Sequence, residues 1–283
     1  MRLLLVRSVY LNTMLSCCRI FIFLFFVDIH LARGQCAEVN QAYKAGEIIE
    51  YNVAYNWGFI WVNAGEAIFK VEEKKIGGQP VFHFHAYGTS LKKWDWIYRV
   101  RDTYESFLDM EYLRPVRFKR NTSEGKYKAN NAYEFDYEKG KVYTATQNSD
   151  KPLSKDTIRL QRCTFDVLSM IYQARNIDYR QYKKDDKIPI SLIIDGEIYN
   201  LYIRYLGEEL LKTRDKKKYK CIKFKPMLVE GTMFSAGENM TVWVTNDQNR
   251  IPLLIEAKVL VGSVKAYLSN THGLKNTMKS LVK

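Results

Sequence analysis

Two histidines lie two residues apart in a segment whose alternating pattern predicts a β-strand. His83 and His85 would share one strand face with Val81 and Tyr87. Two imidazoles at this spacing could ligate one metal ion, so His83 and His85 are the candidate metal ligands. No third ligand is evident nearby. Two half-exposed sheet histidines are therefore the favoured interpretation, and neither a metal nor another cofactor is predicted.

A second candidate for chemistry is the aromatic and charged segment 93–96, with the sequence KWDW. Such a segment could form a turn that grips a ligand by stacking a ring on a sugar or an acyl chain. Trp94 and Trp96 are therefore candidate ligand-binding residues. The favoured alternative is a buried pair of tryptophans that anchors an irregular connection.

Four carboxylates close to this segment could supply an acid and a base for catalysis. They are Asp95, Asp102, Glu105 and Asp109. No serine or histidine lies at a spacing that defines a nucleophile and its base. The sequence therefore predicts no catalytic residue, and a protein without enzymatic activity is favoured over a paired-carboxylate hydrolase.

One segment, Phe165 to Arg175, has the apolar spacing of a helix. Phe165, Leu168 and Tyr172 would share one face, which further apolar residues widen. Such a helix should be buried against a sheet. Phe165 and Tyr172 are the second pair of candidate ligand-binding residues, because an apolar ligand could lie between this helix and the sheet.

Much of the remaining chain alternates with the period of two that is typical of strands with one wet face. Gly65 interrupts one such segment and predicts a bulge or a close approach, and Asp195-Gly196 predicts a hairpin turn. The polar stretch from Gln147 to Asp156 is predicted to be a loop. The fold class that follows is mainly β: a large curved antiparallel sheet or half-open barrel with one central covering helix, or else two packed half-sheets.

The first 34 residues are typical of a signal peptide. An apolar run from Ile20 to Val27 follows Arg19, and Ala32-Arg33-Gly34 fits cleavage before Gln35. Met14 gives a more compact start to such a peptide than Met1. The segment before Cys36 lacks the pattern that precedes a lipid-anchored cysteine. We therefore predict a signal peptide over 1–34, no transmembrane span, and a soluble exported domain over 35–283.

Cleavage at this site would leave Cys36, Cys163 and Cys221, an odd number for an oxidising compartment. One thiol must then stay free or pair between chains. A bridge between Cys163 and Cys221 and the burial of either as a small apolar residue both remain open.

The formal net charge of +13 could indicate a phosphate-bearing partner. Lysines are spread through every segment, however, and 216–218 is the one run of three. That run lies between two strand-like segments, so a solvated hairpin tip is favoured and no nucleic-acid partner is predicted. The sequence does not indicate an oligomeric state.

A series of short motifs recurs in the same order as in a known family. The motifs are Gly46-Glu47 with Tyr51, the run 63–67 (NAGEA), Asp102 with Tyr104, Leu113 with Pro115, Phe135-Asp136, the run 166–169 (DVLS), Trp243-Val244 with Asp247, and Arg250-Ile251-Pro252. Together they resemble bacterial exported proteins of the domain-of-unknown-function family 3108. The resemblance implies an envelope location in Gram-negative bacteria, in the periplasm, and carries no reaction or cofactor.

Two classes of function follow from the sequence. The first is a binding or carrier module whose concave sheet holds an acyl chain or another amphipathic envelope molecule. The second is a structural or protein-interaction module of the periplasm without a small-molecule ligand. A deep apolar groove would favour the first class, and an exposed apolar patch would favour the second.

Overall fold

The computed structural model describes residues 39–57, 60–230, 235–259 and 262–282. These residues belong to one compact unit that begins at Gly34. The predicted signal peptide, its cleavage site, the choice of Met14 as initiator and the state of Cys36 lie outside the described residues.

The first half of the described chain is a meander of eight strands with one 3-10 turn. These elements are β1 Ile48–Trp57, β2 Ile60–Ile76, β3 Gln79–Ser90, η1 Lys92–Trp94, β4 Val100–Asp109, β5 Pro115–Glu124, β6 Tyr127–Asp136, β7 Lys141–Asn148 and β8 Ser154–Arg159. The predicted loop from Gln147 to Asp156 is wrong at both ends, because it overlaps β7 and β8.

The second half adds the helix and the remaining strands. These elements are β9 Thr164–Asp166, α2 Val167–Ala174, η2 Tyr179–Gln181, β10 Lys187–Ile194, β11 Glu197–Lys212, β12 Lys218–Pro226, β13 Met240–Thr245, β14 Pro252–Lys258, β15 Ser263–His272 and β16 Leu281–Val282. Lys216 lies in the turn that joins β11 and β12 and donates its backbone N–H to the carbonyl oxygen of Thr213, as expected of a hairpin tip.

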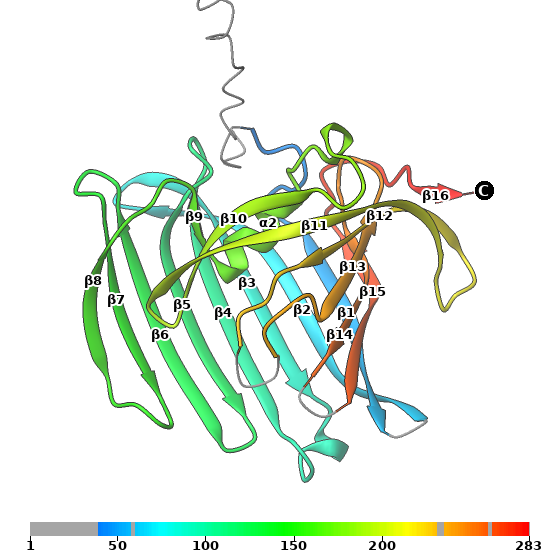
Figure 1. Cartoon of the computed structure of the whole chain (residues 1–283), viewed down its shortest axis with the longest axis horizontal. Coiled ribbons are helices and arrows are strands. Elements are labelled where there is room, and N and C mark those ends of the chain that lie inside the picture. Colours follow the sequence, from blue (N-terminus) through cyan, green and yellow to red (C-terminus); the bar gives the residue numbers. More distant parts are fainter. Residues whose placement is uncertain (1–38, 58–59, 231–234, 260–261, 283) are drawn as a thin grey trace, which may run out of the picture. The chain divides into compact units, whose positions relative to one another are not determined.

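All sixteen strands of the described chain belong to one sheet, in the order β8-β7-β6-β5-β4-β3-β2-β1-β15-β14-β13-β12-β11-β10-β9, with β16 beside β12. Neighbouring strands are antiparallel except β9 and β10, which are parallel. Figure 1 shows the sheet curving so that β10 and β11 pass over β3 to β5 with α2 between them. The predicted fold class, a large curved antiparallel sheet with one central helix, is confirmed.

The helix begins two residues later than the apolar spacing predicts. Phe165 belongs to β9, and the Asp166 carboxylate accepts hydrogen bonds from the backbone N–H groups of Leu168 and Ser169. An aspartate in this position caps a helix by pairing its first free donors. Leu168, Met170 and other helix residues are buried, so the prediction that the helix packs on a sheet is confirmed.

Side chains from the two halves of the sheet and from α2 meet on the concave face and form the main core. Tyr172 of α2 stacks on Phe84 of β3 with ring centroids 3.9 Å apart. Tyr43 meets both rings edge-on. Such aromatic pairs add to the free energy of burial, so this part of the concave face is packed protein interior.

The tip of the β10–β11 hairpin packs against the facing strands. Asp195 and Gly196 form the predicted turn, both with positive φ. Asp195 accepts hydrogen bonds from Arg120 of β5 at 3.0 Å and from Asn131 of β6 at 2.7 Å. The backbone N–H of Gly196 is donated to the hydroxyl of Tyr133. The hairpin therefore holds the curled sheet together across its concave side.

Gly65 confirms the prediction of a bulge or a close approach. The register of β1 against β2 shifts at this position, between Val53 and Ala54. A Cβ at residue 65 would lie 2.5 Å from the carbonyl oxygen of Thr89. The strands can approach this closely because glycine has no side chain.

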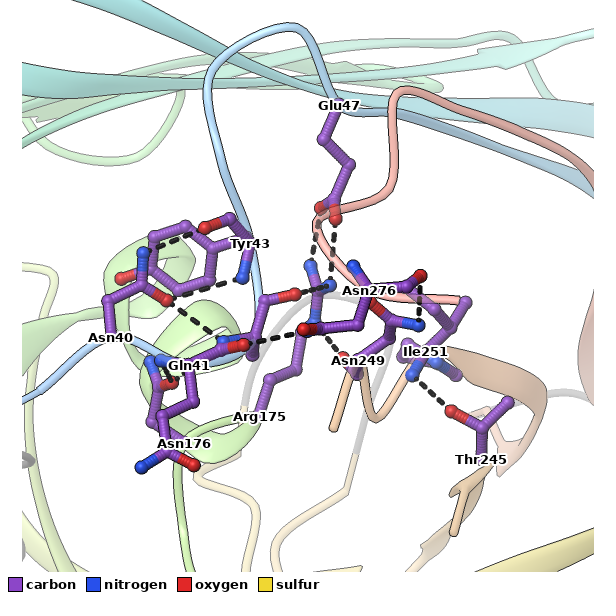
Figure 2. A network of polar contacts seen from close by, with 12 residues as sticks. Asn40, Gln41, Tyr43, Glu47, Arg175, Asn176, Thr245, Asn249, Ile251 and Asn276 are labelled. Atoms are coloured by element: carbon purple, nitrogen blue, oxygen red, sulfur yellow. Dashed lines mark hydrogen bonds and ion pairs between the residues drawn. The ribbon is translucent and has the colours of Figure 1, made fainter. Parts of the chain in front are cut away.

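A buried polar network ties the N-terminal segment of the described chain to α2 and to the β13–β14 turn (Figure 2). The guanidinium of Arg175 pairs with the Glu47 carboxylate at 2.6 and 2.9 Å. It also donates to the carbonyl oxygens of Ala42 and Asn249. We call these four residues the Arg175 clasp. All of them are buried, so the clasp joins segments far apart in sequence.

The cysteines resolve one alternative that the sequence leaves open. Cys163 is disulfide-bonded, whereas Cys221 is a buried free thiol. The two are therefore not bridged to each other, and the partner of Cys163 lies outside the described residues.

Candidate functional site

The turn between β3 and β4 is held from within by an ion pair. Arg101 donates two hydrogen bonds to the Asp95 carboxylate, at 2.6 and 3.2 Å. The hydroxyl of Ser90 donates to the same carboxylate at 2.5 Å. The hydrogen bond from Ser90 and the Arg101 guanidinium hold the pKa of Asp95 below its usual value, although partial desolvation opposes them. Asp95 is therefore a charged anchor of the turn.

The same turn is clamped on both sides by neighbouring elements. The indole N–H of Trp94 donates to the backbone oxygen of Asn63 in β2 at 2.8 Å. On the other side, the ring of Tyr98 packs on Gly125, where a Cβ would lie 2.8 Å from the ring. The backbone N–H of Gly125 donates to the oxygen of Arg99. The turn is thus fixed between β2 and the β5–β6 connection.

This fixed turn presents apolar side chains to solvent. Trp96 is 79% exposed, and its neighbours Ile97 and Tyr98 are 41% and 43% exposed. Trp94 is half-buried. The alternative of a buried tryptophan pair is therefore wrong for Trp96. A large apolar ring that a rigid turn holds exposed to water adds nothing to the core. Such a ring is typical of an interaction site.

Figure 1 shows that β2 begins at the same end of the sheet as the turn between β3 and β4, and its first two residues add exposed apolar side chains. Ile60 is 68% exposed and Trp61 is 38% exposed, with the ammonium of Lys265 lying 4.8 Å from the Trp61 ring. We call these residues the tryptophan rim: Ile60, Trp61, Trp94, Trp96, Ile97 and Tyr98. Sequence reasoning missed Ile60 and Trp61 because only the pairing of β2 with β3 brings the start of β2 to the same end of the sheet as this turn.

Three cations border the tryptophan rim. Lys92, Lys93 and Arg99 are all exposed, and Asp95, the carboxylate within the same turn, is already paired with Arg101. The turn therefore combines exposed apolar rings with an excess of positive charge.

The other candidate ligand-binding residues lie elsewhere. Phe165 and Tyr172 are 2% and 1% exposed and belong to the main core beside α2. They are not part of the tryptophan rim. Their burial identifies them as packing residues of the concave face, and a ligand at this position would have to displace core side chains.

The candidate metal ligands are brought together with carboxylates on the outer face of the sheet. His83 is 5% exposed, and Nδ1 and Nε2 of its ring lie 3.3 and 3.5 Å from oxygens of Glu72 and Glu105. Its ring stacks on Phe107 and on His85. Burial lowers the pKa of His85, which is less buried than His83. The expectation of two half-exposed histidines is therefore wrong for His83.

The four carboxylates near the turn are not brought into one site. Asp95 pairs with Arg101, Glu105 lies beside His83, and Asp109 accepts hydrogen bonds from two backbone N–H groups in its own turn. Asp102 instead lies against Glu124 on the concave face. Burial and then the charge of Glu124 raise the pKa of Asp102 to about 7.

Two properties of the described residues bear on other site types. No group of three or more histidine, cysteine, aspartate or glutamate side chains is arranged to hold a metal ion in this part of the chain. Within the same residues, no helix has the length and apolar character needed to cross a membrane.

The curled sheet, with its helix inside the curve, defines a β-barrel-like class of protein, and a solved structure shares it. That structure is described as a β-barrel-like protein of domain of unknown function DUF1849 from Brucella abortus. The two chains are 8% identical, with a TM-score of 0.53, and the similarity covers 82% of this chain and 99% of the other. At this identity the likeness is one of fold alone.

The chain belongs to the family described as protein of unknown function DUF3108, whose model matches residues 50–269. This confirms the resemblance drawn from the short motifs. No curated protein matches the sequence.

Proposed function

We propose that this protein is an exported envelope module that binds the surface of an anionic amphipathic layer, a lipid membrane, through the tryptophan rim. The observation that carries the proposal is Trp96, an indole ring that is 79% exposed on a turn braced by Asp95 and Arg101. Bracing lowers the conformational entropy that binding would otherwise cost.

The composition of the rim matches a membrane surface. Tryptophan and tyrosine concentrate where apolar chains meet headgroups, because the ring has an apolar body and a polar edge. Lys92, Lys93 and Arg99 would attract anionic headgroups, each by about 1 kcal/mol. Burying one large apolar side chain adds about 1.5–3 kcal/mol. These gains suit reversible surface binding.

Export is supported by two features of the chain. Residues 1–34 have the pattern of a secretory signal peptide, and Cys163 is disulfide-bonded. Disulfides persist in oxidising compartments such as the periplasm. Family membership is consistent with the periplasm of a Gram-negative envelope, where anionic lipid faces the protein.

The packed core argues against a carrier that holds an acyl chain between α2 and the sheet. Phe165 and Tyr172 fill that space with their own side chains. The exposed rim supports contact with the outside of a lipid layer instead. An exposed apolar patch also favours a protein-interaction module, so a protein partner at the same rim is the alternative function. Vesicle binding distinguishes the two.

The test is co-sedimentation of the purified protein with vesicles of phosphatidylglycerol and phosphatidylethanolamine. We expect binding that weakens with added salt, because the charges are screened, and that drops at least about tenfold in Trp96→Ala, a change of 1.4 kcal/mol. Leu210→Ala is the matched control, since Leu210 is 63% exposed on β11, outside the rim.

The basic residues are tested by the double substitution Lys92→Gln and Lys93→Gln. Its matched control is Lys183→Gln with Lys184→Gln, two exposed lysines of another loop. An equal loss of vesicle binding in both double variants would show that net charge alone causes the effect, and would reject the rim as the binding site. Absence of vesicle binding by the unaltered protein would leave the protein-interaction module ahead.

A further inference from the structure

A shallow trough crosses the outer face of the sheet, opposite the concave core, and shares no residue with the tryptophan rim. Two adjoining hollows of about 490 and 430 Å³ form it, over β4 to β8. They share Ala132 and Ala145, which face each other on β6 and β7. The trough exists here because these two small side chains leave its floor low. We call it the outer trough.

A row of neutral polar side chains follows one side of the outer trough. Asn121 pairs with Asn130 across β5 and β6, and Asn130 pairs with Gln147 across β6 and β7. Thr103 of β4 extends the row opposite Asn121. Neighbouring strands lie about 4.8 Å apart, so the row spans about 14 Å. It thus offers hydrogen-bonding groups at a regular spacing along an open surface.

The three amides of this row are exposed, and no hydrogen bond to another side chain or backbone group of the described residues engages them. Each amide carries two N–H donors and one carbonyl acceptor. This capacity suits a ligand that presents donors and acceptors side by side, as the hydroxyl groups of a sugar ring do.

The charges that border the trough are balanced. The charged residues that line it are three carboxylates, Glu105, Glu134 and Asp156, and three cations, Lys119, Arg120 and Lys155. Arg117 is already paired with Glu134 at 2.6 Å. A strongly acidic or basic polymer would gain little net attraction from such a surface, so the trough fits a neutral chain.

Apolar groups complete the surface. The Tyr143 ring is 39% exposed and Leu153 is 56% exposed, and they line different ends of the trough. An aromatic ring can stack on the C–H face of a sugar. The methyl groups of Ala132 and Ala145 lie beside the amide row. An acetamido substituent has the matching pair of groups, a methyl and an amide.

We propose that the outer trough binds a neutral polysaccharide chain that carries acetamido groups, namely a chain of β-linked N-acetylhexosamines. The amide row of Asn121, Asn130 and Gln147 binds hydroxyl and acetamido groups, and the alanine floor holds the acetamido methyl groups. The site is separate from the tryptophan rim, so a protein that binds lipid at the rim could hold a glycan at the same time.

The test is a titration of the purified protein with chitohexaose, followed by ¹H–¹⁵N NMR and calorimetry. We expect saturable binding with a dissociation constant below about 1 mM, near −4 kcal/mol, and chemical-shift changes centred on 119–147. The double variant Asn130→Ala with Gln147→Ala should weaken binding at least about tenfold. Gln79→Ala is the matched control, because Gln79 is an exposed amide at the start of β3, outside the trough.

Cellohexaose tests whether the trough recognises acetamido groups or only a β-linked sugar chain, because it has the same linkage and lacks the acetamido groups. We expect its binding to be at least about tenfold weaker, and equal affinity would reject the acetamido assignment. Filling the floor with Ala145→Gln should also weaken chitohexaose binding, with the thermal midpoint as a check on folding. No saturation by chitohexaose at about 5 mM, or shifts that avoid the trough, would overturn the site. None of these outcomes bears on the proposal that the rim binds vesicles.

Discussion

Arg175 at the end of α2 and Glu47 just before β1 form an ion pair in which both side chains are almost completely buried, 3% and 0% exposed. The two residues lie 128 positions apart in sequence. Four N–H groups of Arg175 are hydrogen-bonded, two to Glu47 and two to backbone oxygens. The clasp therefore holds the helix and the N-terminal segment of the domain together through fully paired charges.

Removing one partner of this pair should destabilise the protein strongly. Arg175→Met would leave the Glu47 carboxylate buried and unpaired, which costs about 3–5 kcal/mol in comparable sites. We expect a loss of that size in the free energy of unfolding, measured with urea. Arg117→Met is the matched control, because its pair with Glu134 is partly exposed, and such pairs contribute about 0–1 kcal/mol. Equal losses in the two variants would mean that the clasp is not buried in solution.

The helix supplies a second prediction about stability. Leu168 is 1% exposed in the core beside α2, so Leu168→Asp would bury an unpaired carboxylate and should cost several kcal/mol, about 3 or more. Ile171→Asp on the same helix is the control, because Ile171 is 40% exposed. Thermal denaturation followed by circular dichroism measures both. A melting temperature of the Leu168 variant within a degree or so of the unaltered protein would contradict the packing of α2.

The strands that sequence could predict are those with one wet and one dry face. In β6 the side chains of 129, 131, 133 and 135 are buried and those between them are mostly exposed, which gives the period of two. β8 has no such pattern because nearly all of its side chains are exposed at the sheet edge. In β9 all three side chains are buried, and Phe165 happens to lie at helical spacing from Leu168 and Tyr172. Periodicity cannot separate such cases.

The tryptophan rim could be predicted only in part, because contacts between strands, which the sequence does not show, determine which of its side chains are exposed. Trp94 and Trp96 are conspicuous in the sequence, but their exposure depends on the pairing of Asp95 with Arg101 and of Trp94 with Asn63. The outer trough left no sequence signal, because Asn121, Asn130 and Gln147 become neighbours only through the strand register. Amides spaced in this way look like ordinary solvent-facing strand residues.

The cysteines give a prediction about the protein after the predicted cleavage. Cys163 is disulfide-bonded and Cys221 is free, so if cleavage precedes Gln35, Cys36 is the remaining cysteine. We expect peptide mapping without reductant to find Cys36 joined to Cys163. Burial raises the pKa of Cys221 to about 12, so its thiol should react with iodoacetamide only after unfolding. Free Cys36 in protein purified from the envelope would contradict the bond.

Asp102 predicts how stability depends on pH. Its pKa is raised from 3.8 to about 7, first by burial and then by the neighbouring Glu124. Asp102 in the folded protein therefore binds its proton more tightly than in the unfolded chain. Its contribution to the free energy of unfolding is greatest below pH 3.8 and decreases as the pH rises towards about 7. The positive charge of Arg120 opposes this rise in the pKa of Asp102, and Tyr98 is close enough to be affected by the charge of Asp102.

Asp102→Asn isolates this effect, because an asparagine resembles the protonated acid: its oxygen can accept from the Ser123 N–H as Asp102 does, and its amide can donate to Glu124. We expect the variant to match the unaltered protein below pH 3.8, where Asp102 is protonated in both the folded and the unfolded chain, and to become increasingly the more stable of the two as the pH rises towards about 7 in urea titrations. Only the difference in the free energy of unfolding between the two proteins reports on Asp102, since Asp166, whose pKa is raised to about 6 by burial, titrates in both. Parallel stability curves from about pH 4 to about pH 8 would show that Asp102 titrates alike in the folded and unfolded chains, and would contradict the raised pKa of Asp102.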